Sequence, residues 1–409
     1  GLKEAAAFGV TDLSYGFDFS AVVQRKNAVV EQLRGGVEGL LGHKLITFVR
    51  GKAAFVDEHT VMVTPVVTAD GSEDCGQDGE SSESKVYSAD YIIIATGSIS
   101  ASLPIPGADL PGILTSKEIL DLQEIPKSLC VIGGGVIGLE FASIFRSFGS
   151  EVTVVEYCKD ILPRFDTDLA KRLKQSLGKR GIEINTQAQV TSITENSGEY
   201  TVTFTRKGKE ETVVADKVLM AVGRKANVAS LNLADAGIEF TPRGIIVNDV
   251  MQTNVPHIYA VGDINGKMML AHAATFQGIV ALDHMMGISN EIDLSVMPAA
   301  VFTSPEAATV GMTEDECKEK GIAVKCLKSF FRANGKAVTM GETDGFCKLV
   351  VEAESPYGIL GCHLYGPHSS DIIQEVTALI NRKTTLDEFR SIIHTHPTLV
   401  EVLQSAAHQ

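Results

Sequence analysis

The chain has 409 residues, of which 44% are hydrophobic and 21% charged, and its net charge is −15. This length exceeds what one hydrophobic core usually supports, so we expect two to four domains. The acidic balance argues against nucleic acid as a partner, because binding to phosphates requires a basic face. The longest apolar stretch, residues 129–139, is interrupted by glycines and is too short to span a bilayer.

The seven cysteines are scattered and form no C-x-x-C motif. This pattern indicates neither a disulfide framework nor a zinc site, and it favours a reducing compartment. Cys130 lies inside an apolar run and is expected to be a small buried hydrophobic residue.

The first hundred residues predict a helix followed by strands. Val22–Leu41 has the pattern of an amphipathic helix, and Lys44–Ile94 has the pattern of strands that flank a polar segment. That segment, Thr68–Lys85, holds six acidic residues and one basic residue and is expected to be a solvated loop. Residues 101–112 contain three prolines and two glycines, as is typical of a connector.

The strongest local motif is LCVIGGGVIGLE at residues 129–140, in which a β-rich run precedes G-x-G-x-x-G. An apolar helical stretch follows at 139–148, and a second strand, EVTVVE, ends at Glu156. The first glycine permits a tight turn, the second lets the backbone approach a pyrophosphate, and the third allows close helix–strand packing. A glycine-rich turn without a ligand is the alternative, and the complete β-α-β context disfavours it.

Glu156 indicates which dinucleotide would bind. It lies 18 residues after Gly138, where a carboxylate can accept hydrogen bonds from a ribose 2′-hydroxyl. The same carboxylate would repel a 2′-phosphate, so the sequence favours NAD over NADP.

Residues 89–97 (ADYIIIATG) and 215–223 (ADKVLMAVG) form an internal repeat. Two nucleotide-binding units would explain it, although chance similarity of two apolar strands is an alternative. The same repeat offset would put a first glycine-rich motif near residue 7, where the sequence AAAFGV does not fit. The opening of the first unit is therefore expected to lie before Gly1.

The second half of the sequence predicts further helices and strands and then a change of composition. Asp166–Gly181 is a predicted helix, short strands extend to Val222, and Val255–Asp263 is a strand that ends in Gly-Asp. After Pro298 we expect a separate α+β domain. The remaining predicted elements are the helix 269–286, the strands 346–351 and 358–365, and the helices 370–381 and 386–393.

Eight motifs occur in an order that resembles the pyridine nucleotide–disulfide oxidoreductases, and within them the dihydrolipoamide dehydrogenases. They are ATGS (95–98), TSKEIL (115–120), GGGVIGLE (133–140), AVGRKAN (221–227), YAVGD (259–263), MLAHAA (269–274), TSPE (303–306) and HTHPT (394–398). The resemblance implies an α/β fold with two Rossmann-like dinucleotide-binding domains, for FAD and NAD, of which the first is incomplete, and a C-terminal α+β dimerisation domain. The expected divisions are 1–100 for the rest of the FAD domain, 101–244 for the NAD domain, 245–298 for a central domain that completes the FAD site, and 299–409 for dimerisation.

The resemblance also implies roles for individual residues. FAD would be held by Ala53, Thr96, Gly97, Ser98, Gly262, Asp263, Met269, Leu270, Ala271 and His272. NAD would be held by Gly133, Gly134, Gly135, Val136, Ile137, Gly138, Glu140, Glu156, Val190 and Gly223. Taken alone, Asp263 could equally be a turn former at a strand end.

In HTHPTLVE the resemblance makes His396 the proton acceptor and Glu401 its orienting partner. A dithiol must lose a proton to become nucleophilic, and a neutral imidazole can accept it near neutral pH. His394 and His396 would point to opposite faces of an extended segment, so a shared metal is disfavoured. Val400 departs from the family's usual serine and removes one expected hydrogen bond near Glu401.

The family's redox disulfide has the spacing C-x-x-x-x-C and precedes the part of the family that this sequence resembles. No pair of cysteines in this chain has that spacing, so the sequence assigns the disulfide to none of them.

The implied function is oxidation of dihydrolipoamide, with electrons passing through FAD to NAD in a homodimer in which His396 serves the opposite subunit. The implied partner is the lipoyl-bearing acyltransferase of a 2-oxo acid dehydrogenase complex or the lipoyl carrier of glycine cleavage, in the cytoplasm or, in a eukaryote, the mitochondrial matrix. One alternative is another FAD-dependent disulfide or metal-ion reductase of the family. A second alternative is a catalytically incomplete NAD-binding dimeric module.

Overall fold

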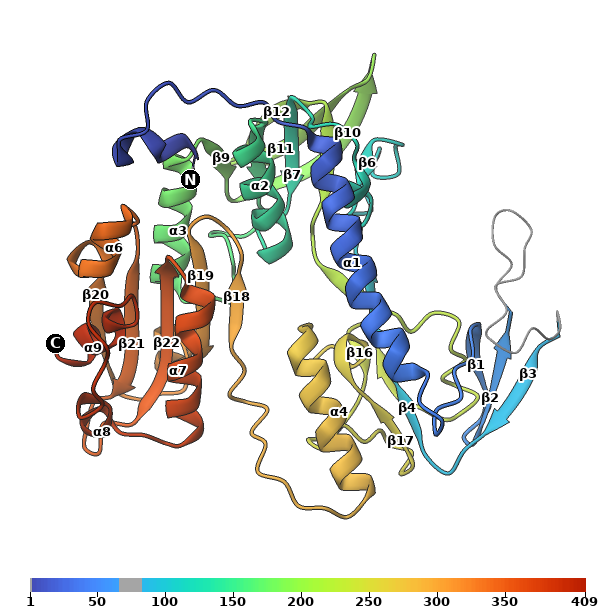
Figure 1. The fold of residues 1–409 in the computed structure, drawn as a ribbon. Coiled ribbons are helices and arrows are strands. Elements are labelled where there is room, and N and C mark those ends of the chain that lie inside the picture. The colour runs from blue at the N-terminus through green and yellow to red at the C-terminus, as the bar shows by residue number, and fades with distance from the viewer. Residues whose placement is uncertain (1, 66–82) are drawn as a thin grey trace.

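The computed structural model describes residues 2–65 and 83–409, which form a five-stranded parallel sheet, a five-stranded antiparallel sheet and smaller sheets of two or three strands (Figure 1). The acidic run Thr68–Lys85, with Cys75, lies almost entirely outside the described residues. No helix within the described ranges is long and apolar enough to cross a lipid bilayer.

The middle of the chain forms a parallel sheet of five strands in the order β6-β13-β7-β8-β9. These strands are β6 (Ile113–Leu114), β13 (Lys217–Met220), β7 (Ser128–Ile132), β8 (Glu151–Val155) and β9 (Ile182–Asn185). Helix α2 (Val136–Phe148) joins β7 to β8, as the glycine motif predicts, but it begins three residues earlier than expected. Helix α3 (Thr167–Lys179) begins after Asp166, whose side chain accepts from the backbone N–H groups of Asp168 and Leu169.

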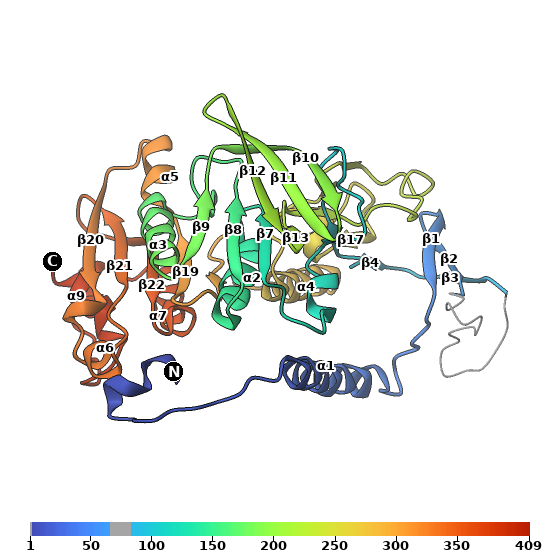
Figure 2. The same cartoon turned by 90° about the horizontal axis from the view of Figure 1, so that it is seen from above.

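Different elements pack on the two faces of this sheet. Successive side chains along a strand point to opposite faces, so neighbouring residues of β7 contact different elements. Leu129 and Val131 of β7 pack with the apolar residues of α2 and α3. Cys130 and Ile132 point the other way and pack against a three-stranded antiparallel sheet, which Figure 2 shows on the opposite side from α2. That sheet consists of β10 (Ala188–Asn196), β11 (Glu199–Arg206) and β12 (Lys209–Ala215). The predicted burial of Cys130 is confirmed, and burial raises the pKa of its thiol to about 12.

The internal repeat is confirmed as a structural feature. β4 (Ile92–Ile94) and β13 are both strands followed by a glycine with positive φ, +69° at Gly97 and +117° at Gly223. The strands that follow, β5 (Ser98–Ser100) and β14 (Arg224–Ala226), pair with each other in antiparallel fashion. Asn227 N donates to Gly97 O at 2.9 Å, so the two copies are joined where each repeat ends.

The N-terminal residues contain a short 3₁₀ turn, η1 (Leu2–Phe8), and helix α1 (Phe19–Leu41). The helix begins three residues before the predicted Val22, because the side chain of Asp18 accepts from Ala21 N. Only Val23 is buried in this helix, whereas Leu33 and Leu40 are 67% and 73% exposed. The predicted helix therefore forms, and Phe19 at its start packs against Phe145 and Phe148, but most of its other apolar positions are exposed.

A small antiparallel sheet follows α1 and has the order β1-β2-β3. Its strands are β1 (Lys52–Asp57), β2 (Thr60–Thr64) and β3 (Lys85–Ser88). The predicted connector at 101–112 has no helix or strand. The central region consists of β15 (Phe240–Thr241), β16 (Gly244–Ile245), β17 (Ile258–Ala260), the turn η3 (Gly262–Asn265) and helix α4 (Ala271–Met285). β17 pairs in parallel with β4, so the chain segments after these two strands emerge at the same edge.

The C-terminal region is a five-stranded antiparallel sheet with helices packed against it (Figure 1). In order its strands are β18 (Ala299–Val301), β19 (Glu306–Gly311), β22 (Ile359–Gly366), β21 (Phe346–Glu352) and β20 (Val324–Phe330). Its helices are α5 (Glu314–Glu319), α6 (Gly335–Met340), α7 (Ser369–Asn381), α8 (Leu386–Arg390) and α9 (Glu401–Ala407). Helix α8 stops three residues before the predicted Ile393, and the segment after it leads into the HTHPT motif. The α/β class with a final α+β region is confirmed.

A buried ion cluster joins the parallel sheet's helix α3 to the C-terminal sheet. Lys348, 1% exposed on β21, places Nζ 2.9 Å from Asp166 Oδ2, 3.1 Å from Asp168 Oδ2 and 2.7 Å from Glu314 Oε2. Burial raises the pKa of Asp168, but the hydrogen bonds from Lys328 and Lys348 outweigh it and lower the pKa to about 2. The bonds from Lys318 and Lys348 likewise lower the pKa of Glu314 to about 2.

These lowered pKa values predict how the free energy of unfolding depends on pH. A carboxyl with a depressed pKa in the folded state stabilises the fold above its unfolded pKa, here 3.8 for Asp168 and 4.5 for Glu314. The contribution is lost as the pH falls through about 2, so we expect the free energy of unfolding to decline steeply between about pH 4 and pH 2. Denaturant unfolding across this range measures the slope. Equal slopes for the wild type and Lys348→Met would contradict the assignment to this cluster.

Candidate functional site

The glycine motif lies where β7, β8 and β13 end at one edge of the parallel sheet. Gly133 has φ +113°, and a Cβ there would meet Ala221 O at 2.3 Å. A Cβ on Gly138 would meet Gly133 O at 2.1 Å, whereas one on Gly135 would meet nothing within 4 Å. Two of the glycines are therefore required by packing, and the third leaves open space at the N-terminus of α2.

Glu156 is held beside this turn in a fixed orientation. It is 7% exposed, its Oε2 accepts from Gly134 N and its Oε1 accepts from Cys158 N, each at 2.5 Å. Ala188 N donates to Glu156 O, which brings the start of β10 alongside, and Val190 packs in the same core as Ile132. The glycine turn and Glu156 of the predicted dinucleotide set are thus together at one sheet edge. Open space at a helix N-terminus and a buried carboxylate near it fit a dinucleotide.

Glu140 faces away from this group. Its Oε1 accepts from Phe302 N at 2.9 Å, next to the end of β18. Burial raises the pKa of the Glu140 carboxyl, and the Phe302 N–H offsets part of that effect. Glu140 therefore links α2 to the C-terminal region.

Two glycine variants separate packing from ligand binding. We expect Gly135→Ala to fold normally and to weaken NADH binding by about tenfold or more, because the pyrophosphate must approach this backbone. Gly138→Ala should instead lower the melting temperature, since its Cβ meets a backbone carbonyl. Calorimetric titration with NADH and thermal unfolding measure the two effects. Unchanged NADH affinity in Gly135→Ala would remove this turn from the binding site.

The second group of predicted residues lies where β4 and β17 end. Ser98 Oγ donates to Asp263 Oδ2 at 2.5 Å, and Arg224 Nε lies 2.6 Å from Ser98 Oγ and 3.9 Å from Asp263 Oδ2. Gly97 has positive φ, and a Cβ there would meet nothing within 4 Å. A carboxylate at the carboxyl ends of parallel strands, beside an open glycine, fits the sugar or ribityl hydroxyls of a flavin nucleotide.

Helix α4 is tied to the same edge. Gly262 N and Asn265 Nδ2 both donate to Gln277 Oε1 at 2.8 Å, which fixes the turn after β17 against the helix. Met269 and Leu270 lead into the helix, Ala271 is its first residue, and His272 Nε2 lies 2.8 Å from Pro298 O. Ala53 belongs to the sheet β1-β2-β3, whose residue Phe55 packs in one core with Ile94 and Ala260.

Arg224 and Gln277 are missing from the sequence-based set. Arg224 lies in the AVGRKAN motif, but its partner Ser98 is 126 positions away in the sequence, so no local pattern indicates their contact. Gln277 does carry a local signal, because it falls at helical spacing on the same stripe of α4 as Ala273, Val280 and Ala281. In the structure it is 3% exposed. A glutamine on such a stripe indicates a buried hydrogen-bond partner.

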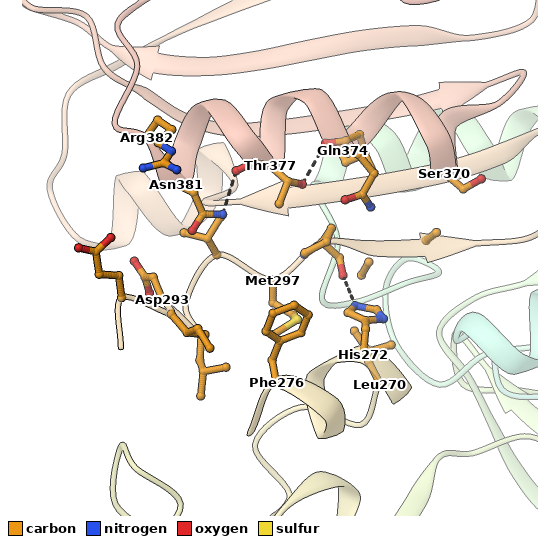
Figure 3. A pocket seen from close by; sticks show the side chains of 18 of the residues that line it. Leu270, His272, Phe276, Asp293, Met297, Ser370, Gln374, Thr377, Asn381 and Arg382 are labelled. Atoms are coloured by element: carbon orange, nitrogen blue, oxygen red, sulfur yellow. Dashed lines mark hydrogen bonds between the residues drawn. The ribbon is translucent and has the colours of Figure 1, made fainter. Parts of the chain in front are cut away.

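A groove of about 900 Å³ lies between α4 and α7 (Figure 3). Figure 3 shows His272 bonded to the backbone at Pro298 and the side chains of Thr377 and Asn381 along α7. Its lining includes Leu270 and His272 of the predicted flavin set but neither the glycine motif nor the HTHPT segment. The size of this groove therefore does not identify the site of proton transfer.

The HTHPT segment places a histidine–carboxylate pair at the surface. His396 Nδ1 lies 2.9 Å from Glu401 Oε1, and the imidazole is 76% exposed while Glu401 is 21% exposed. Thr398 N donates to Glu401 Oε2 at 2.8 Å, and this bond, followed by that from His396, lowers the pKa of the Glu401 carboxyl. An ionised Glu401 would accept Nδ1–H, which leaves Nε2 of His396 as the basic atom and directs it outward.

Comparisons with known proteins agree with this arrangement. The chain is 40% identical to a dihydrolipoyl dehydrogenase from Chlamydia muridarum, over 99% of this chain and 83% of that protein. It is 39% identical to one from Bacillus subtilis, with the same two coverages. Its structure is similar to LpdA from Mycobacterium tuberculosis, with a TM-score of 0.85 and 27% identity, over 100% of this chain and 86% of that chain. The HOCl-induced flavoprotein disulfide reductase RclA from Escherichia coli gives 0.84 and 28%, over 96% and 86%.

Two family models cover most of the sequence. Residues 3–278 match the model described as pyridine nucleotide-disulphide oxidoreductase. Residues 297–407 match the dimerisation domain of the same family, which includes the HTHPT segment. The chain therefore belongs to the pyridine nucleotide-disulphide oxidoreductase family.

Proposed function

We propose that this protein oxidises dihydrolipoamide, with FAD as the bound redox group and NAD as the final acceptor. The observation that carries the proposal is the His396–Glu401 pair, whose geometry leaves a basic nitrogen directed outward from the surface. The dehydrogenase relatives at about 40% identity support the choice of dithiol.

The protein's own part in the reaction is movement of a proton. His396 Nε2 accepts the proton of a substrate thiol, and the resulting thiolate becomes the nucleophile. Glu401 holds Nδ1–H and stabilises the imidazolium that forms. The overall reaction balances as dithiol plus NAD⁺ giving cyclic disulfide, NADH and one proton.

FAD, when bound, would relay the electron pair between the dithiol and the nicotinamide. We assign its hydroxyl contacts to Asp263, with Ser98, Gly97 and Gly262 beside it, and its ring environment to residues 269–272. For NAD we assign the pyrophosphate to the turn at 133–138 and the adenosine ribose to Glu156.

In a homodimer, the exposed His396 would face the other subunit. The match of residues 297–407 to a dimerisation domain supports an interface in this region. We propose that His396 of one subunit serves the site of the other, and that the substrate is carried by the acyltransferase of a 2-oxo acid dehydrogenase complex or by a glycine-cleavage carrier in the cytoplasm.

Substrate and cofactor choice test the proposal on the full-length protein. With NADH as the donor, we expect reduction of lipoamide and little reduction of glutathione disulfide. NADPH should be a poor donor. Glu156→Ala should narrow the difference between the rates with NADPH and NADH, because it removes the charge that repels a 2′-phosphate. Preference for glutathione disulfide, or for NADPH in the wild type, would favour a different reductase of the family.

A further inference from the structure

A second histidine–carboxylate pair lies behind the first. His394 Nε2 lies 2.9 Å from Glu375 Oε1 on α7, and the His394 side chain is only 4% exposed. Its Nδ1 lies 3.2 Å from Ile392 O, and its ring packs edge-on against Phe389 with the centroids 5.7 Å apart. The neutral ring can donate to one of these two acceptors, and the protonated ring to both.

The two histidines differ in exposure because alternate residues of an extended segment point to opposite sides. His394 points inward at 4% exposure and His396 points outward at 76%. The backbone between them therefore cannot shift without breaking either the His394–Glu375 contact or the His396–Glu401 contact.

The two pairs anchor the segment to different helices. Glu401 belongs to α9, and Asn334 Nδ2 donates to Thr398 O at 2.9 Å on the same side. Glu375 belongs to the middle of α7, whose apolar residues Ile373 and Val376 are in the core of the C-terminal region. Without the Glu375 contact, the hydrogen bonds described here from neighbouring side chains to residues 394–398 would be those of Asn334 and Glu401, which meet residues 396–399.

We propose that His394 and Glu375 are positioning residues for His396, fixing the orientation in which His396 Nε2 meets the thiol. This inference rests on the proposed function. Neither residue would touch the dithiol itself. Their loss should therefore lower kcat for dithiol oxidation more than it changes KM.

The test compares His394→Leu and Glu375→Gln with a matched control, Asp371→Asn. Asp371 is one turn before Glu375 on the same helix and contacts His368 at 3.4 Å, but it is 81% exposed. We expect kcat for dihydrolipoamide oxidation to fall by about tenfold or more in the first two variants, since small misplacements of a catalytic group are costly. KM and NADH oxidation by an artificial acceptor should stay within about twofold, and Asp371→Asn should match the wild type.

A conservative variant and a measurement that needs no turnover complete the test. His394→Gln can keep an N–H donor toward Glu375 and should recover most of kcat. Amide hydrogen exchange at residues 394–398, including Thr398 N, should accelerate in His394→Leu and not in Asp371→Asn.

The two proposals fail in different ways. A wild type that does not oxidise dihydrolipoamide would overturn the proposed function itself. An active wild type, with His394→Leu retaining its kcat and its exchange pattern, would overturn the positioning role alone.

Discussion

Replacement of His396 by alanine is expected to lower kcat for dihydrolipoamide oxidation by about 10²-fold or more. The reason is that His396 Nε2 is the atom that accepts the thiol proton, while Glu401 holds Nδ1 at 2.9 Å. NADH oxidation by an artificial electron acceptor should remain largely intact, because that reaction does not use a substrate thiol. Steady-state rates for the two reactions, measured on one preparation of flavin-loaded protein, provide the comparison.

His408 supplies the matched control for this variant. It is an exposed histidine at the C-terminal end of α9, and no role in the site is assigned to it. His408→Ala should match the wild type in both reactions. Equal dihydrolipoamide activity in His396→Ala and His408→Ala would remove His396 from the mechanism.

Replacement of Lys348 by methionine is expected to cost about 3–5 kcal/mol in the free energy of unfolding. Methionine fills most of the same volume but leaves Asp166, which is 1% exposed, without its cation. Asp166 also caps α3, so the loss weakens the contact between α3 and β21. Urea unfolding of the wild type and the variant measures the difference.

Lys328→Met is the matched control for Lys348→Met. Lys328 contacts Asp168 at 2.7 Å, but its side chain is 34% exposed, so its loss should cost less than about 1 kcal/mol. Similar unfolding midpoints for the two variants would contradict the special role of the buried lysine.

The parts of the fold that were predictable from the sequence depend on local patterns. The strand–turn–helix at residues 128–148 is specified by glycine spacing and by an apolar run, and both are contiguous in the chain. The repeat at 89–97 and 215–223 was visible as well, because each copy has its own apolar strand and its own glycine, although only the strand of the second copy is largely buried. The end of α8 at Arg390 was less visible, because Ile392 and Ile393 extend its apolar pattern.

Contacts between distant residues could not be predicted in this way. Arg224, Ser98 and Asp263 meet only because β5 pairs with β14 and β4 pairs with β17. Lys348 has the sequence pattern of an ordinary strand lysine, and its burial follows from three carboxylates that come from α3, its N-cap and α5. The pair His396–Glu401 is close in sequence, yet its role came from the resemblance and not from any local rule.

An anaerobic titration followed by the flavin absorbance tests most directly whether this protein couples a dithiol to NAD. We expect dihydrolipoamide to reduce the flavin-loaded full-length protein, and we expect NAD, but not NADP, to restore the oxidised spectrum with formation of NADH. A flavin that dihydrolipoamide leaves unchanged, or that NADP reoxidises as readily as NAD, would contradict the proposed function.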